Sequence, residues 1–350
     1  MGERLVAGRL LVVAAVVVLL AGCDSGATPS SSPTTAATTA PSLVVATPPP
    51  ALGAVVMTPD VRFSDSTPAE SWTRPVMDVF APTSARHLPL VIILPAHSLT
   101  STDFPVYHQV AEAIAEKGTV AVVANWSQTE GGTGDPAAVA TFSADGRSVA
   151  ACAVTYAVEH AAEFGADPSR LVLVGQFYGA NIASLVALAP SEPLPGCRAG
   201  TTTWAATGVV GWDGDWLAQY EAWDAFGPDA AKVVAALSPW PLAASAPKLP
   251  MTFVTSDLAA DETRRCETAD VPWLTWRDPD GAMRARLGSV GALDDGCVDS
   301  VESAKAMAAE FEAHGFHTSL VHLTEAGSTE SHLRPADLSR IVDAVVTLAR

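Results

Sequence analysis

The sequence predicts an α/β fold with a mostly parallel central sheet and helices on both faces. Two observations lead to this prediction. Short apolar runs rich in valine, typical of strands buried on both faces, alternate along the chain with longer amphipathic segments, as right-handed crossovers between parallel strands require. One stretch, residues 170–188, reads as a strand, a tight turn bounded by glycines and a helix.

Residues 1–22 have the features of a lipoprotein signal peptide. Arg4 and Arg9 form a positive region, and the apolar segment Leu10–Leu20, with 11 residues, is too short to span a bilayer well. The following run LAGC, which ends at Cys23, resembles a bacterial lipobox. This resemblance implies cleavage before Cys23 and lipidation of its thiol, for example by palmitate, so we expect an exported protein anchored to the outer face of a bacterial cell membrane.

Three further divisions follow from composition. Residues 23–50 begin with the lipidated cysteine and continue as a tether of Ser, Thr, Pro and Ala, which lacks the bulk to fold. Residues 51–350 form the predicted domain. Within it, a helical cap is expected at about 213–247 and an insertion closed by a disulfide at about 258–297.

The net charge excludes one class of partner. The 350 residues include 38 acidic and 20 basic side chains, a formal net charge of −18. Nothing in this composition provides the basic field that a nucleic acid or an anionic membrane surface requires. We therefore expect no nucleic-acid partner, and we predict no cofactor.

The cysteines indicate an oxidising compartment. With Cys23 assigned to lipid, Cys152, Cys197, Cys266 and Cys297 remain, an even number that allows three connectivities. We favour Cys152 with Cys197, which flank the helix after the turn, and Cys266 with Cys297, which close one loop. A zinc site is the alternative, but the spacings differ from those of zinc-binding pairs, so we predict no metal.

The elements are predicted in chain order from apolar periodicity. The first half of the domain contains an edge strand at Val55–Asp65, strands Val76–Pro82 and Leu88–Pro95, helix Phe104–Lys117, strand Thr119–Trp126, a polar loop at 127–144 and helix Ser148–Phe164 capped by Asp145. The second half contains strand Leu171–Val174, helix Asn181–Leu188, strand Trp204–Trp212, strand Met251–Ser256, helix Val301–His314, strand His317–Leu323 and helix Pro335–Ala349.

The turn between Leu171–Val174 and its helix reads GQFYG at residues 175–179, and GANIA follows from Gly179. This stretch resembles the nucleophile elbow of the α/β-hydrolase superfamily, whose esterases carry a GGNLA run there, and it implies that fold. A nucleotide-binding α/β protein is the alternative, but the sequence has neither a GxGxxG fingerprint nor a Walker lysine. The central residue of the elbow is Phe177, whose phenyl ring has no lone pair to attack a carbonyl carbon.

The resemblance extends on both sides of the elbow. The runs MDVFAPT and LPLVIILPAHS are similar to the opening of secreted esterases related to dienelactone hydrolases. In that family the turn after this strand donates N–H groups to the oxyanion. Pro95 has no N–H, so the resemblance leaves Ala96, His97 and, after the elbow, Tyr178 as oxyanion-like positions.

The remaining triad positions also follow from the resemblance. Asp257 directly follows Met251–Ser256, where the family places its acid, and Asp261 is the alternative; Asp257 can equally be a loop carboxylate or a helix cap. His332 follows the last strand where the family places its histidine, somewhat late in register. It is either a displaced remnant or an exposed loop histidine.

The departures from the esterase pattern at Phe177, Pro95 and His332 lead to three functional hypotheses. The first is a lipid-anchored pseudoenzyme that binds a small ligand or a protein partner in the inherited cleft. The second is an esterase with a relocated nucleophile, Ser98 or Ser143, or with water activated by His332. The third is a solute-binding lipoprotein, although only one doubly wound unit is evident where such proteins have two lobes. Aromatic residues of the expected cap, such as Trp216 and Trp240, either grip a ligand or pack the cap's core.

Overall fold

The computed structural model describes residues 52–69, 72–96, 105–127, 136–214, 216, 238–256, 265–266, 285–286, 289, 297–298, 300–323 and 333–350, with the backbone alone at 136–143, 265–266, 297–298 and 300. All of these residues lie in one compact unit, Pro50–Arg350.

The strands of the central sheet are β1 (Val55–Arg62), β2 (Val76–Pro82), β3 (Leu88–Leu94), β4 (Val120–Ala124), β5 (Ala166–Gln176), β6 (Gly208–Trp212), β7 (Met251–Ser256) and β10 (Thr318–Leu323), and a separate pair is formed by β8 (Arg265–Cys266) and β9 (Cys297–Val298). The helices are α1 (Pro105–Glu116), α2 (Pro136–Glu159), α3 (Ala161–Phe164), α4 (Tyr178–Leu188), the 3-10 turn η2 (Trp240–Leu242), α11 (Ser300–Ala313) and α12 (Pro335–Ala349).

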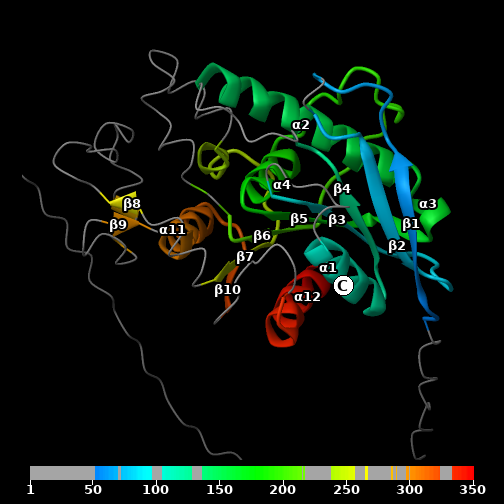
Figure 1. Ribbon diagram of the computed structural model, residues 1–350. Helices are drawn as coiled ribbons and strands as arrows, with labels where there is room; N and C mark the ends of the chain where they lie inside the picture. Colours follow the sequence, from blue (N-terminus) through cyan, green and yellow to red (C-terminus); the bar gives the residue numbers. More distant parts are fainter. Residues whose placement is uncertain are drawn as a thin grey trace, which may run out of the picture. The chain divides into compact units, whose positions relative to one another are not determined.

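The sheet has the order β1-β2-β4-β3-β5-β6-β7-β10 (Figure 1). Every neighbouring pair from β4 to β10 is parallel, and β2 pairs with β1 and β4 in the antiparallel sense. The predicted mostly parallel sheet is therefore confirmed.

Two apolar layers cover the two faces of this sheet. Side chains alternate along β5, so that Leu173 belongs to the layer that includes α2, α4 and α11, whereas Val172 and Val174 belong to the layer that includes α1 and α12. Figure 1 shows α2 and α4 on one side of the sheet and α1 and α12 on the other. Strands β4 and β6 are buried along their whole length. This burial explains why their sequences contain several valines and do not alternate between apolar and polar residues.

The chain changes direction at the centre of the sheet. From β3 it crosses through α1 to β4 on one side, and from β5 it crosses through α4 to β6 on the other. Because β3 and β5 are neighbours, their carboxyl ends form a topological switch point, where open α/β sheets usually bind ligands.

Most predicted elements are confirmed to within a few residues, and β2, β7 and α12 have the predicted bounds. The prediction for α2 was wrong at its start. This helix begins at Pro136, so Asp145 lies inside it and does not cap it. Proline is favourable in a first helical turn. Gly146, inside the helix, avoids a close contact, since a Cβ there would lie 2.9 Å from the Trp126 ring.

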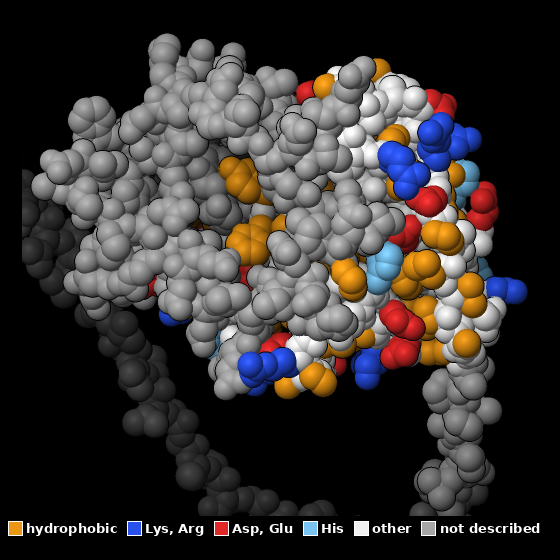
Figure 2. All heavy atoms as spheres, viewed as in Figure 1, with side chains coloured by type: hydrophobic (Ala, Val, Ile, Leu, Met, Phe, Trp, Pro, Cys, Tyr) orange, Lys and Arg blue, Asp and Glu red, His pale blue; other side chains and the backbone are white. Residues whose placement is uncertain are grey.

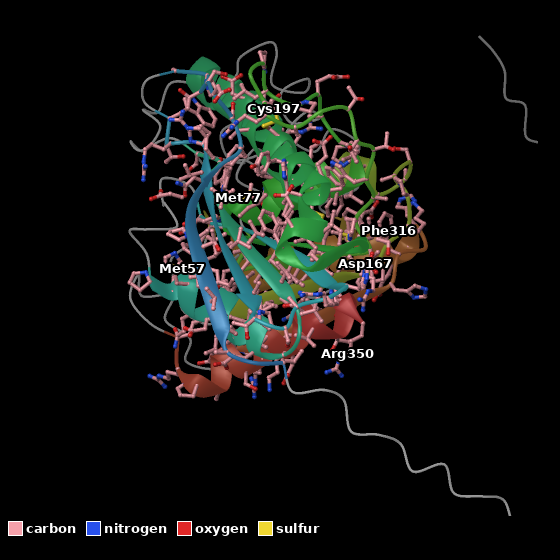
Figure 3. The ribbon with its side chains drawn as sticks, turned by 90° about the vertical axis from the view of Figure 1, so that its right-hand side faces the viewer. Met57, Met77, Asp167, Cys197, Phe316 and Arg350 are labelled. Atoms are coloured by element: carbon pink, nitrogen blue, oxygen red, sulfur yellow. A yellow bond between two sulfur atoms is a disulfide. The ribbon has the colours of Figure 1, made fainter. Side chains whose placement is uncertain are left out.

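The predicted disulfide between Cys152 and Cys197 is confirmed. The sulfur atoms are bonded with the Cα atoms 5.7 Å apart, and the bond is drawn beside the Cys197 label in Figure 3. It ties the middle of α2 to the segment after α4. Cys266 and Cys297 are directly opposite in the antiparallel pair β8–β9, a register compatible with the second predicted disulfide, which stays a prediction.

Charges of both signs share the described part of one face of the domain. In the view of Figure 2, Lys and Arg side chains lie among Asp and Glu on the described part of that face. Within the described ranges, no helix is long and apolar enough to cross a membrane.

Candidate functional site

The elbow lies at the switch point. Phe177 separates β5 from α4. Its backbone has φ 48° and ψ −123°, a conformation that residues other than glycine rarely adopt. Its N–H donates to the carbonyl of Trp212 at the end of β6, and its carbonyl accepts from the N–H of Ala180. These bonds hold the strained residue in place at the carboxyl edge, where its side chain is half-buried.

Two glycines make this turn possible. A Cβ on Gly175 would lie 2.0 Å from the carbonyl oxygen of Gly179, and a Cβ on Gly179 would lie 2.3 Å from that of Leu94. No side chain fits at either distance. The GxFxG spacing is therefore required by the close approach of β5, α4 and the end of β3, as the sequence predicted for an elbow.

The segment after β3 is fixed by two buried side chains. The indole N–H of Trp126 donates to the carbonyl of Pro95 at 2.7 Å. The N–H of Ala96 donates to the hydroxyl oxygen of Tyr107 at 2.9 Å, and this hydroxyl donates to Oε1 of Gln176 at 2.6 Å. Ala96 thus lies at the edge where an oxyanion donor was expected, with its N–H bonded within the protein.

Tyr107 acts in this network as a neutral hydroxyl. Burial raises its pKa well above the ordinary value for tyrosine, and the hydrogen bond from the Ala96 amide opposes this only in part. A neutral hydroxyl accepts one hydrogen bond and donates another, as observed here.

A buried carboxylate lies beside the elbow and was not among the predicted site residues. Asp213 follows β6 directly, is fully buried and has φ 45°. Its two oxygens accept from the backbone N–H of Ser256 at 2.6 Å and from the Ser256 hydroxyl at 2.9 Å. Its position after a strand at the carboxyl edge was visible in the sequence, but its burial depends on contacts with β7.

The structure describes only some of the predicted site positions. Phe177 and Tyr178 lie at the elbow, Tyr178 half-buried as the first residue of α4, and Ala96 lies across from them at the end of β3. Ser143 falls in α2, where the backbone alone is described. The remaining positions lie outside the described residues: Cys23, His97, Ser98, Asp257, Asp261 and His332.

The described aromatic residues of the expected cap, Trp216 and Trp240, are core residues. Trp216 is 1% exposed, and its ring makes an edge contact with Phe253 at 5.2 Å between centroids. A Cβ on Gly211 would lie 2.4 Å from the Trp216 ring, so this glycine in β6 makes room for the indole. Trp240 is also buried. Of the two alternatives for these aromatics, core packing applies to Trp216 and Trp240.

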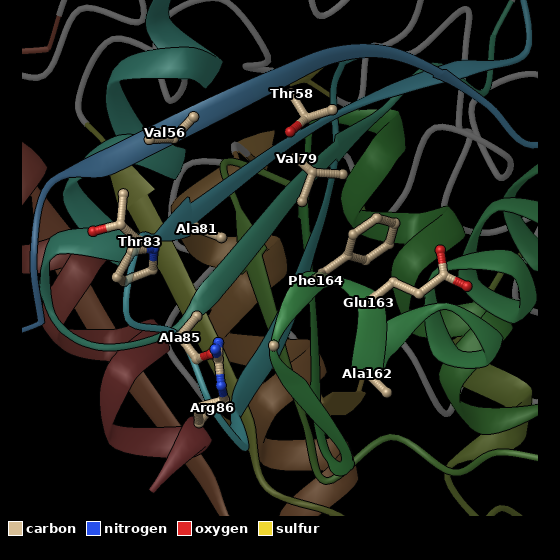
Figure 4. Close-up of a pocket in the computed structure, with 12 residues that line it drawn as sticks. Val56, Thr58, Val79, Ala81, Thr83, Ala85, Arg86, Ala162, Glu163 and Phe164 are labelled. Atoms are coloured by element: carbon tan, nitrogen blue, oxygen red, sulfur yellow. The ribbon is translucent and has the colours of Figure 1, made fainter.

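A hollow lies at the amino edge of the sheet, opposite the elbow. It has a volume of about 380 Å³ and lies between β1 and β2 on one side and the α3 turn with Glu163 and Phe164 on the other (Figure 4). It contains none of the predicted site residues. Among the side chains that the structure describes, no three His, Cys, Asp or Glu residues gather as metal ligands would.

Strand order, crossovers and the strained turn after β5 together decide the fold. The domain has the α/β-hydrolase fold. Solved structures support this assignment: esterase B from Lactobacillus rhamnosis superposes with a TM-score of 0.54 at 11% identity, over 84% of this chain and 85% of that one.

Two other esterases superpose in the same way. A truncated carbohydrate esterase from gut microbiota gives a TM-score of 0.52 at 11% identity, over 84% of this chain and 96% of that chain. A propionate-bound thermophilic esterase from Thermogutta terrifontis gives 0.50 at 16% identity, over 86% and 96%. No protein-family model and no curated protein matches the sequence. At these identities, the likeness establishes the fold alone.

Proposed function

We propose that the α/β-hydrolase domain binds a ligand at the carboxyl edge of its sheet without forming an acyl-enzyme. The observation that carries this proposal is the side chain at the elbow. Phe177 has the strained backbone conformation at which such a fold presents its nucleophile, and its phenyl ring can neither attack a carbonyl carbon nor give a proton to a base.

The fold supports a binding role at this edge. The solved structures that superpose on the domain are esterases, one of them with propionate bound. The switch point between β3 and β5 is the place where such sheets take small organic ligands. A small organic ligand bound there, without a serine to acylate, is the simplest use of the elbow that Phe177 permits.

We also propose that the domain works outside the cell, anchored to the membrane by lipid on Cys23. The signal-like segment, the cysteine that follows it and the polar tether support this proposal. The disulfide between Cys152 and Cys197 agrees with an oxidising compartment.

The test uses a fluorophosphonate serine probe on the full-length protein, purified in detergent, with a short-chain ester assay in parallel. We expect no labelling and no ester turnover above background for the native protein, because the elbow lacks a hydroxyl. We expect Phe177→Ser to label if the base survives. Phe164→Ser, which introduces a serine at another half-buried phenylalanine at the amino edge, is the matched control and should stay unlabelled.

Labelling of the native protein would contradict the proposal. It would show a nucleophile elsewhere, with Ser98 and Ser143 as the first serines to replace. Turnover without labelling would instead indicate water activated by His332, with Asp257 or Asp261 as its partner. Both results would favour an esterase with relocated chemistry.

A further inference from the structure

Tyr107 joins the carboxyl ends of the two strands that flank the switch point. It projects from α1 and is fully buried, and its hydroxyl oxygen lies 2.9 Å from the nitrogen of Ala96 and 2.6 Å from Oε1 of Gln176. Ala96 follows β3, and Gln176 is the last residue of β5, directly before Phe177. One hydroxyl therefore satisfies a donor from one strand end and an acceptor from the next.

This hydroxyl bonds to the residue that precedes Phe177, and the segment that carries Ala96 packs against the same turn. Leu94 and Gly175 are paired in the sheet, and the first turn of α4 packs so tightly on the end of β3 that a Cβ on Gly179 would lie 2.4 Å from the carbonyl oxygen of Pro95. The indole N–H of Trp126 donates to that same carbonyl. The Ala96 amide is thus held against the turn that carries Phe177.

We infer that Tyr107 closes the Ala96 amide to ligands, so that the elbow lacks this oxygen-binding donor independently of the side chain at position 177. The Tyr107 oxygen occupies the acceptor position that a carbonyl or phosphonyl oxygen of a ligand would take. This inference rests on the proposed function, since it describes what the ligand site can bind. Ligands of the native site are those that do not need a hydrogen bond from Ala96.

The inference can be tested by removing one atom, the hydroxyl oxygen of Tyr107. Tyr107→Phe keeps the ring in the apolar layer under α1 and removes only the hydroxyl, which leaves room for one oxygen from a ligand. A preorganised N–H aimed at a developing oxyanion is worth about 100-fold to 1000-fold in rate in acyl transfer, so restoring even a poorly aligned donor should be measurable.

The experiment compares labelling rates with a fluorophosphonate in the Phe177→Ser background. We expect the double variant Phe177→Ser/Tyr107→Phe to label about tenfold faster, or more, than Phe177→Ser alone. The matched control is Phe177→Ser/Tyr156→Phe, which removes a tyrosine hydroxyl from α2, where the ring stacks on His160. This control should label at the rate of the single variant.

Amide hydrogen exchange in the native background gives the second readout. Tyr107→Phe should speed exchange of the Ala96 amide and leave Ile93, inside β3, unchanged, whereas Tyr156→Phe should change neither. A double variant that labels no faster than a labelled Phe177→Ser protein would overturn the inference, and so would a Tyr107→Phe protein whose Ala96 amide exchanges no faster than in the native protein. Labelling of the native protein bears only on the proposed function, because the rate comparison uses Phe177→Ser variants throughout.

Discussion

Phe177 combines a backbone suited to glycine with one of the largest apolar side chains. A residue held at φ 48° and ψ −123° costs about 1–3 kcal/mol when it carries a Cβ, and the surrounding structure must impose that conformation. Gly175 and Gly179 impose it by bringing β5 and α4 within backbone contact. The strain is therefore present although residue 177 carries no nucleophilic group.

This strain predicts an inverted order of stability at the elbow. Phe177→Gly should be more stable than Phe177→Ala by about 1–2 kcal/mol, because both variants lose the ring but only glycine relaxes the backbone. Equilibrium unfolding in urea measures the difference. At Ala113, inside α1, the usual order should hold, with Ala113→Gly less stable than native by about 1 kcal/mol. An alanine variant at least as stable as the glycine variant at position 177 would show that the turn is not strained.

At the scale of elements, α1 determines much of the site. Its Tyr107 reaches the ends of β3 and β5, and its next residue, His108, makes a 2.9 Å contact from Nε2 to the fully buried carboxylate of Asp78 in β2. Asp78 also accepts from the N–H of Asp60 in β1. One helix thus connects the edge of the sheet to its switch point through polar contacts, besides burying the apolar face formed by Val110, Ala111, Ile114 and Ala115 that its sequence predicted.

The disulfide between α2 and the segment after α4 should stabilise the domain substantially. Its cysteines are 45 residues apart in sequence. Closing a loop of that length removes unfolded-chain entropy worth about 4 kcal/mol. We expect Cys152→Ala/Cys197→Ala to unfold at a correspondingly lower urea concentration under oxidising conditions, and a loss below about 1 kcal/mol would contradict this account. Any effect of reductant that persists in this double variant reports the predicted bond between Cys266 and Cys297.

At the scale of the whole molecule, the sequence predicts an anchor, a tether and a folded domain with different physical tasks. The predicted tether is composed mostly of Ser, Thr, Pro and Ala, whereas the described domain buries continuous apolar layers on both faces of its sheet. We expect full-length protein expressed in a bacterial host to fractionate with membranes and Cys23→Ser protein to be released, because lipid on Cys23 is the anchor that we propose.

Intact mass should show a lipid increment on the native chain and none on Cys23→Ser. Cys266→Ser is the control that should remain in the membrane fraction. A Cys23→Ser protein that still sediments with membranes would show that another part of the chain provides the anchor.

The sequence by itself determined the local features of this protein. Apolar periodicity predicted most strands and helices, and the glycine spacing around Phe177 predicted the elbow, because both depend on neighbours within a few residues. The tertiary structure alone decided which residues of the site are hydrogen-bonded to one another. Tyr107 and Gln176 are 69 positions apart, and Ser256 is 43 from Asp213. Tyrosine in an amphipathic helix reads as core, and aspartate after a strand reads as loop, until the order of the strands brings their polar atoms to the same edge.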